Sequence, residues 1–158
     1  MRALILYYSK TGHTEQAARG IARGLEGAGV ECVLSMAGSA GSGPPDPSEF
    51  DILVLGTPTY GNRMYRQPAR QVQAFLDSIG DGSLGGKTCG AFAVNAGWGA
   101  SRLVGNMERA LARKGASVMA GGPAVKAGAP LSLWKGPDAS AEDVRKCEEF
   151  GRRLASSA

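Results

Sequence analysis

Apolar and polar residues along this chain alternate in blocks that fit buried strands separated by amphipathic helices. Mostly apolar runs at 3–8, 51–56 and 88–94 are typical of strands buried on both faces of a parallel sheet. Residues 30–36 alternate between apolar and polar positions, which predicts a further strand. A fifth strand is predicted at 117–125.

Between these strands, apolar residues recur at helical spacing and predict four helices. The first should start with Thr14 as its N-cap and end near Ala28. The second should start near Pro68, and the third should follow the loop at 95–100. In the last, Ser140 and Asp143 form a capping pattern.

Five strands that alternate with helices predict a doubly wound α/β fold, with a parallel sheet covered by helices on both faces. The length of 158 residues fits a single domain, 1–158, in which the Gly-, Ser- and Pro-rich stretch 37–48 is a surface loop. Ligands of such sheets bind beyond the carboxyl ends of the strands. Three unusual loops follow the first, third and fourth strands, so we expect them to meet at that edge.

The first of these loops has the chemistry of an anion site. It joins a buried strand to a helix start, where backbone N–H groups and the positive end of the helix dipole converge. Ser9, Thr11 and Thr14 add three hydroxyl groups, and Gly12 permits close approach of the backbone. The loop therefore suits a phosphate monoester.

The second and third loops each place an aromatic residue among small ones. Tyr60 lies in the loop at 56–65, and Trp98 lies between two glycines in the loop at 95–101. A planar heteroaromatic ligand needs such rings to stack on and free backbone groups to bind its polar edge. Phosphate at one end and an aromatic slot at the other predict a mononucleotide with a large flat ring.

These loops resemble those of the flavodoxin family. Residues 9–14 match its phosphate loop, Ser/Thr-x-Thr-Gly-x-Thr, while 56–60 and 97–99 are similar to its second and third FMN loops. The resemblance implies a five-stranded parallel sheet in the order 2-1-3-4-5, FMN as cofactor, and Tyr60 and Trp98 flanking the isoalloxazine. The cofactor-binding residues that it implies are Ser9, Lys10, Thr11, Gly12, His13, Thr14, Pro58, Thr59, Tyr60, Gly61, Asn62, Asn95, Ala96, Gly97, Trp98 and Gly99.

For His13, the only histidine, packing within the loop remains an alternative to contact with the ligand. We expect no metal site and no catalytic side chain, because the flavin itself carries out the redox chemistry.

Two subfamilies match different parts of the chain. Residues 58–64, 75–77 and 86–87 resemble NAD(P)H:quinone oxidoreductases of the tryptophan-repressor-binding type, whereas 91–99 resembles the flavodoxin domain of diiron flavoproteins. We predict an FMN-dependent carrier of electrons between partner proteins, because the third loop and the chain length depart from the quinone reductase pattern. The alternative is an NAD(P)H-dependent flavin oxidoreductase that reduces quinones.

The charge distribution argues for an acidic partner and against nucleic acid. The formal net charge is +4, but the basic residues are scattered and form no stripe interleaved with aromatic residues. The cofactor loops carry Arg63, Arg66 and Arg102 and no acid. These arginines suit redox partner proteins with acidic surfaces, or the phosphates of NAD(P)H.

The three cysteines, Cys32, Cys89 and Cys147, are widely spaced and predict neither a disulfide framework nor a zinc site. The apolar segments are too short to cross a bilayer, and the N-terminal residues lack the layout of a signal peptide. We therefore expect a cytoplasmic protein that is not inserted in a membrane.

Overall fold

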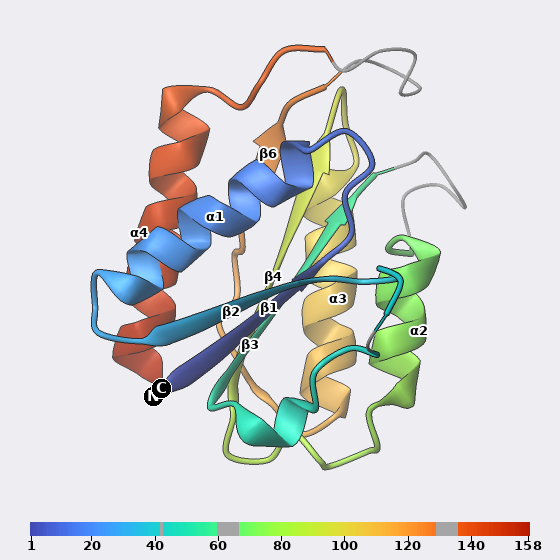
Figure 1. Cartoon of the computed structure of the whole chain (residues 1–158), viewed down its shortest axis with the longest axis vertical. Coiled ribbons are helices and arrows are strands. Elements are labelled where there is room, and N and C mark those ends of the chain that lie inside the picture. Colours follow the sequence, from blue (N-terminus) through green and yellow to red (C-terminus); the bar gives the residue numbers. More distant parts are fainter. Residues whose placement is uncertain (42, 60–66, 129–135) are drawn as a thin grey trace.

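The computed structural model describes residues 1–41, 43–59, 67–128 and 136–158. Its strands are β1 (Arg2–Tyr7), β2 (Glu31–Met36), β3 (Ile52–Pro58), β4 (Thr88–Asn95), β5 (Ser117–Val118) and β6 (Ala124–Lys126). Its helices are α1 (His13–Glu26), α2 (Arg70–Ser78), α3 (Ala100–Arg113) and α4 (Ala141–Ser157), with a short 3₁₀ helix at Pro47–Glu49. Figure 1 shows the sheet at the centre with helices on both sides.

The sheet is parallel, with strand order β2-β1-β3-β4-β5, and β6 also pairs with β4. The predicted doubly wound α/β fold and its strand order are thereby confirmed. Alternate residues of β1 point to opposite faces, as the pleat requires. Ala3 and Ile5 join the core beneath α1 and α4, while Leu4 and Leu6 join the core beneath α2 and α3.

The prediction of one continuous strand at 117–125 is wrong, because β5 and β6 are separate segments along the same edge of β4. Between them Gly122 passes so close to β4 that a Cβ there would overlap the carbonyl oxygen of Ala91. The Gly122 N–H donates instead to Glu108 Oε1 on α3, at 3.0 Å. Pro123, which follows, has no N–H to contribute to a ladder. The ladder is therefore interrupted at this point.

Helices α1 and α4 pack unusually closely, through glycine. Gly24 of α1 lies against the backbone of Glu148, and Gly151 of α4 lies against the backbone of Ile21. At the edge of this contact Arg23 Nε donates to Glu148 Oε1 at 2.8 Å. Because neither glycine has a side chain, the two helix backbones can approach each other directly.

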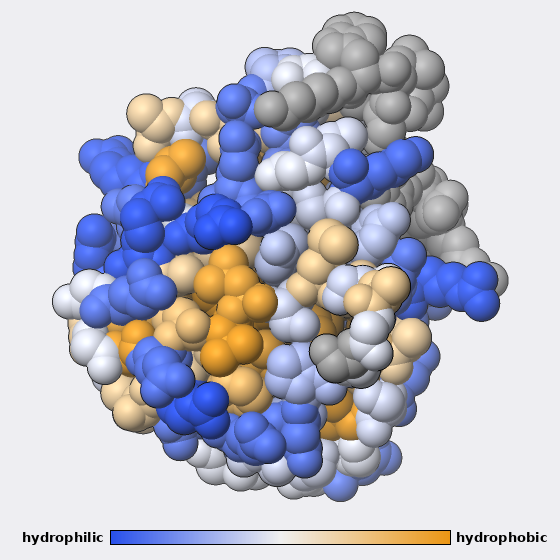
Figure 2. All heavy atoms as spheres, in the orientation of Figure 1, coloured by the Kyte–Doolittle hydropathy of each residue, from blue (hydrophilic) through white to orange (hydrophobic). Residues whose placement is uncertain are grey.

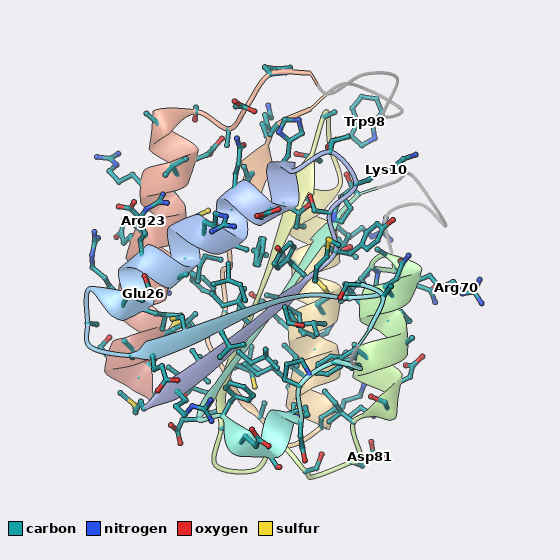
Figure 3. All side chains as sticks on the ribbon, viewed as in Figure 1. Lys10, Arg23, Glu26, Arg70, Asp81 and Trp98 are labelled. Carbon is teal, nitrogen blue, oxygen red and sulfur yellow. The ribbon has the colours of Figure 1, made fainter. Side chains whose placement is uncertain are left out.

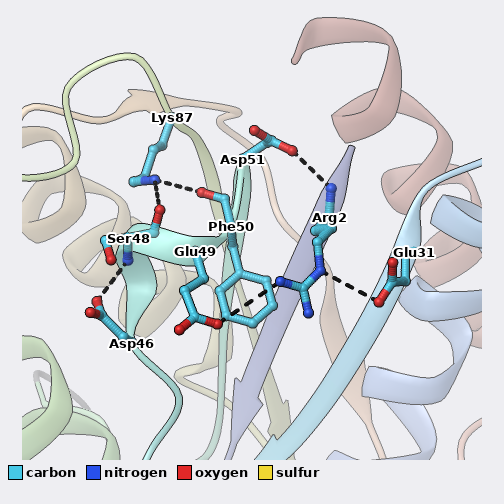
Figure 4. Close-up of polar contacts among 8 residues, drawn as sticks. All are labelled: Arg2, Glu31, Asp46, Ser48, Glu49, Phe50, Asp51 and Lys87. Atoms are coloured by element: carbon cyan, nitrogen blue, oxygen red, sulfur yellow. Dashed lines mark hydrogen bonds and ion pairs between the residues drawn. The ribbon is translucent and has the colours of Figure 1, made fainter.

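A network of polar contacts fastens the amino edge of the sheet (Figure 4). The Arg2 N–H donates to Asp51 Oδ2 at 2.8 Å, and the Arg2 guanidinium lies 5.0 Å from the centre of the Phe50 ring. Lys87 Nζ donates to the carbonyl oxygens of Ser48, at 3.2 Å, and Phe50, at 2.6 Å. These contacts hold the connection between β2 and β3 against the sheet.

The edge strand β2 is only partly covered. Figure 2 shows apolar side chains gathered over it and surrounded by hydrophilic residues. Cys32, Val33 and Leu34 are half-buried, and Met36 is exposed. Within the described part of the chain, no helix is both long and apolar enough to cross a membrane.

Candidate functional site

The three loops singled out in the sequence begin at the carboxyl ends of neighbouring strands. Backbone hydrogen bonds continue from strand to strand at this edge: the Tyr8 N–H donates to Gly56 O at 3.1 Å, and the Thr59 N–H donates to Val94 O at 2.9 Å. Because β1, β3 and β4 are adjacent in the sheet, the start of each loop lies beside the next. Residues far apart in the sequence are thus brought to one edge, as expected.

The first loop ends in a helix start that no side chain caps. Gly12 is the N-cap of α1, with φ at 91°, and its carbonyl accepts the Gln16 N–H at 3.0 Å. The N–H groups of residues 13–15 therefore have no acceptor within the helix. Thr14 lies inside α1, so its prediction as the N-cap is wrong: the left-handed turn at Gly12 starts the helix two residues earlier.

The space around this turn is open on one side. A Cβ at Gly12 would meet no atom within 4 Å, and the Gly12 N–H donates to Ser9 Oγ at 3.0 Å, which closes the loop on itself. Lys10 is exposed, whereas Ser9 and Thr11 are half-buried. An anion above Gly12 would face N–H groups and the positive end of α1.

His13 and Thr14 are buried beneath this loop. The His13 Nδ1 atom lies 3.6 Å from Asp138 Oδ1, in the segment that leads into α4. This position favours a packing role for the His13 imidazole, so that any contact of His13 with an anion at this loop would come from its backbone N–H in the first turn of α1. The imidazole joins the first loop to a part of the chain more than a hundred residues away.

The second loop is anchored at both ends by a residue that the sequence analysis missed. Thr57, completely buried in β3, accepts the Ala69 N–H on Oγ1 at 2.8 Å and donates to Pro58 O at 3.1 Å. In the sequence, the only sign of this role is that Thr57 is a hydroxyl residue at the end of an apolar run. Pro58 and Thr59 are half-buried at the end of β3. The predicted residues Tyr60, Gly61 and Asn62, together with Arg63 and Arg66, lie outside the described residues.

The third loop repeats the geometry of the first. Asn95 is buried at the end of β4, and Gly99, with φ at 93°, is the N-cap of α3 without a side-chain cap. Ala96 and Gly97 are exposed. Trp98, between Gly97 and Gly99, is 74% exposed, which is unusual for so large an apolar side chain. Figure 3 shows Trp98 and Lys10 at the same end of the molecule, above the carboxyl ends of the strands.

This arrangement fits a flavin mononucleotide. The uncapped start of α1 suits the phosphate, and an exposed indole between two glycines suits a flat ring. The neighbouring Tyr7 phenol stays neutral, because burial, together with the nearby Glu15 carboxylate, raises its pKa.

A model of the flavodoxin family matches residues 5–150. The chain belongs to the flavodoxin family. The match begins in β1 and ends in α4, so it includes the strands that carry the three loops. As a member of the flavodoxin family, the chain forms an FMN-binding fold, as the sequence motifs predict.

This flavodoxin-family chain is similar to curated proteins in sequence and to solved structures in fold. An NAD(P)H dehydrogenase (quinone) of Paraburkholderia phymatum is 33% identical over 117 residues, which are 60% of this chain and 57% of that protein. The chain thus spans little more than half the length of the curated relatives that it matches. Among solved structures, flavodoxin 1 of Bacillus cereus has a TM-score of 0.78 at 22% identity, covering 100% of this chain and 99% of that one. A flavodiiron protein of Giardia intestinalis has a TM-score of 0.74 at 18% identity, covering 98% of this chain and 35% of that one. These structures share the fold.

Proposed function

We propose that this protein is a single-domain FMN electron carrier, in which residues 1–158 form the FMN-binding domain and electrons pass to and from redox partner proteins. The observation that carries the proposal is the exposed Trp98 just beyond β4, beside the ends of β1 and β3, from which the first and second loops start. A flavin held against this indole lies at the rim of the molecule, where another protein can approach it. Bound FMN supplies the redox chemistry, and the protein supplies binding, orientation and electrostatics.

In this proposal the first loop holds the phosphate, through the N–H groups at the start of α1 and the hydroxyl groups around them. The second and third loops hold the ring, with Trp98 against one of its faces. Support comes from the open space at Gly12 and from the two uncapped helix starts at this edge. The proposed FMN ligands are Ser9, Lys10, Thr11, Gly12, His13, Thr14, Pro58, Thr59, Tyr60, Gly61, Asn62, Asn95, Ala96, Gly97, Trp98 and Gly99.

The second candidate function is NAD(P)H-dependent reduction of quinones. It is favoured by the curated relatives, which are 30–35% identical to this chain and bear the name NAD(P)H dehydrogenase (quinone). Arg70 and Arg102, exposed at the starts of α2 and α3, suit the phosphates of a nicotinamide nucleotide. In this case the same flavin site would receive hydride from NAD(P)H directly.

The two functions differ in what reduces the flavin. FMN-loaded protein is mixed anaerobically with NADH or NADPH in a stopped-flow instrument, and absorbance at the flavin maximum is followed. For a carrier we expect no bleaching within seconds, while dithionite, as control, bleaches the flavin fully. Rapid bleaching by either nucleotide would show that the protein is an NAD(P)H-dependent reductase and would refute the proposal of an electron carrier. Apoprotein that does not take up FMN would refute both.

We also propose that the protein works in the cytoplasm. The support is its cysteine chemistry: Cys32, Cys89 and Cys147 are free thiols, and the latter two are buried. Unpaired thiols of this kind are typical of a reducing compartment.

A further inference from the structure

Four exposed cationic side chains line the edge of the molecule at which the three loops meet. They come from four different segments: the first loop, the start of α2, the first turn of α3 and the end of β6. We name this set the cationic rim, and it consists of Lys10, Arg70, Arg102 and Lys126. Within the described residues, none of the four takes part in an ion pair. Their charges therefore face the solvent without compensation.

The acids at the same end of the molecule do not neutralise this rim. Glu15 accepts a 2.7 Å hydrogen bond from Arg19 on α1, and Lys146 lies 2.9 Å from Glu142 on α4. These pairs belong to the face covered by α1 and α4. The described acids at this end, each facing a basic group, are Glu15, Asp138, Glu142 and Asp143.

The rim is too wide for one small anion to contact as a whole. Lys10, Arg70 and Arg102 come after β1, β3 and β4, and Lys126 ends β6. These four strands are successive neighbours in the sheet. With about 4.8 Å between neighbouring strands, a row of four strands spans about 14 Å. This width exceeds both a single phosphate group and the Debye length of about 8 Å at physiological salt. An extended acidic surface, in contrast, can face all four cations at once.

We infer that the cationic rim is the docking surface for an acidic redox protein, which it attracts and orients so that the partner meets the edge of the flavin. This inference rests on the proposed function, because a docking surface at this edge is useful only if the flavin exchanges electrons there. The rim raises the rate of encounter, and long-range attraction of this kind weakens steeply as salt is added.

The test uses two probe proteins of opposite charge. Reduced, FMN-loaded protein is mixed anaerobically with ferric cytochrome b5, which is acidic, or with ferric cytochrome c, which is basic. Each fully reduced flavin gives two electrons, one to each of two ferric haems, and releases its proton to the buffer. With cytochrome b5 we expect the second-order rate constant to fall about tenfold or more between low and high salt. With cytochrome c it should stay constant or rise.

A matched pair of variants locates the effect. Arg102 and Arg113 are both exposed on α3, at opposite ends of the helix, so Arg102→Glu and Arg113→Glu change the net charge equally. We expect Arg102→Glu to slow electron transfer to cytochrome b5 at low salt by about three- to tenfold, and Arg113→Glu by less than about 1.5-fold. Both variants should bind FMN with the flavin spectrum of the unaltered protein.

Equal rates for the two variants, or faster transfer to cytochrome c than to cytochrome b5 at low salt, would overturn the inference. Suppose instead that Arg102→Glu raised the KM for NADPH, but not for NADH, and left the rate with cytochrome b5 unchanged. That result would overturn the inference and assign the rim to a nucleotide phosphate. Failure of FMN binding, or of electron transfer to both cytochromes, would refute the proposed function. If electrons pass to cytochrome b5 at a rate that does not depend on salt, the docking surface would be refuted while the proposed function would stand.

Discussion

Replacing Gly24 by alanine tests the close contact between α1 and α4. In the interior of an ordinary helix this change stabilises a protein, by about 1 kcal/mol, because alanine has the higher helix propensity. At Gly24 the new Cβ would overlap the carbonyl oxygen of Glu148 and lie 2.8 Å from the carbonyl carbon and 3.1 Å from Arg152 N. All three atoms belong to the backbone of α4, so no side-chain rotation can relieve the overlap. The two helices must separate.

Separation loosens the core between these helices, which includes Ile21 and Phe150. Overpacking of this kind costs about 1–3 kcal/mol, and the rigidity of two helix backbones places Gly24 at the upper end of that range. After subtraction of the gain in helix propensity, we expect Gly24→Ala to lower the free energy of unfolding by about 2 kcal/mol. For a chain of 158 residues this corresponds to a fall of about 6 °C in Tm.

Gly105 provides the control, because it lies within α3 and a Cβ there would meet no atom within 4 Å. Gly105→Ala should therefore raise the free energy of unfolding by about 0.5–1 kcal/mol. Both values are measured by urea denaturation of the apoprotein, followed by circular dichroism. If Gly24→Ala were as stabilising as Gly105→Ala, the packing of α1 on α4 described here would be wrong.

Three other expectations concern the loops and the buried thiols. Thr57→Val leaves the Ala69 N–H without its acceptor and should lower the free energy of unfolding by about 1–3 kcal/mol in urea; an unchanged midpoint would contradict that anchor. Trp98→Ala should leave the stability of the apoprotein within about 0.5 kcal/mol, since the indole is exposed, yet weaken FMN binding about tenfold in a fluorescence titration. If Trp98→Ala bound FMN as tightly as the unaltered protein does, Trp98 would not be part of the FMN site. Burial raises the pKa of Cys89 and of Cys147 from 9.0 to about 12. The unfolded thiols lose their protons first, so stability is complete below pH 9 and should decline above it, by up to about 1.4 kcal/mol per pH unit for each thiol. A urea midpoint that holds steady up to pH 11 would count against this burial.

Much of the fold could be predicted because its signals are local. The apolar runs of β1, β3 and β4 lie within about two residues of their expected bounds, since strands buried on both faces need mostly apolar sequence. The cap at the start of α4 was also predictable: the Asp143 N–H donates to Ser140 Oγ at 3.1 Å. The position of the three loops followed from topology, because parallel strands end at a common edge.

Features that depend on neighbours distant in sequence could not be predicted. The interruption between β5 and β6 arises because Gly122 passes against Ala91 of β4. The anchor from Thr57 to Ala69 spans a whole loop, and nothing in a hydroxyl residue at the end of an apolar run specifies its partner. The hydroxyl motif at 9–14 favoured Thr14 as N-cap, but the positive φ of Gly12 places the helix start earlier.

The sequence alone therefore determined the main strands and the three loops, because periodicity and short motifs depend on residues close together in the chain. The resemblance of those motifs to the flavodoxin family added the family and, with it, the strand order. Only the tertiary structure decided how those loops are supported. It buried His13 near Asp138, left Trp98 exposed, and placed along one edge four cations that have no ion-pair partner among the described residues. Each of these results depends on which distant segments the folded chain brings together, and that is a property of packing in three dimensions.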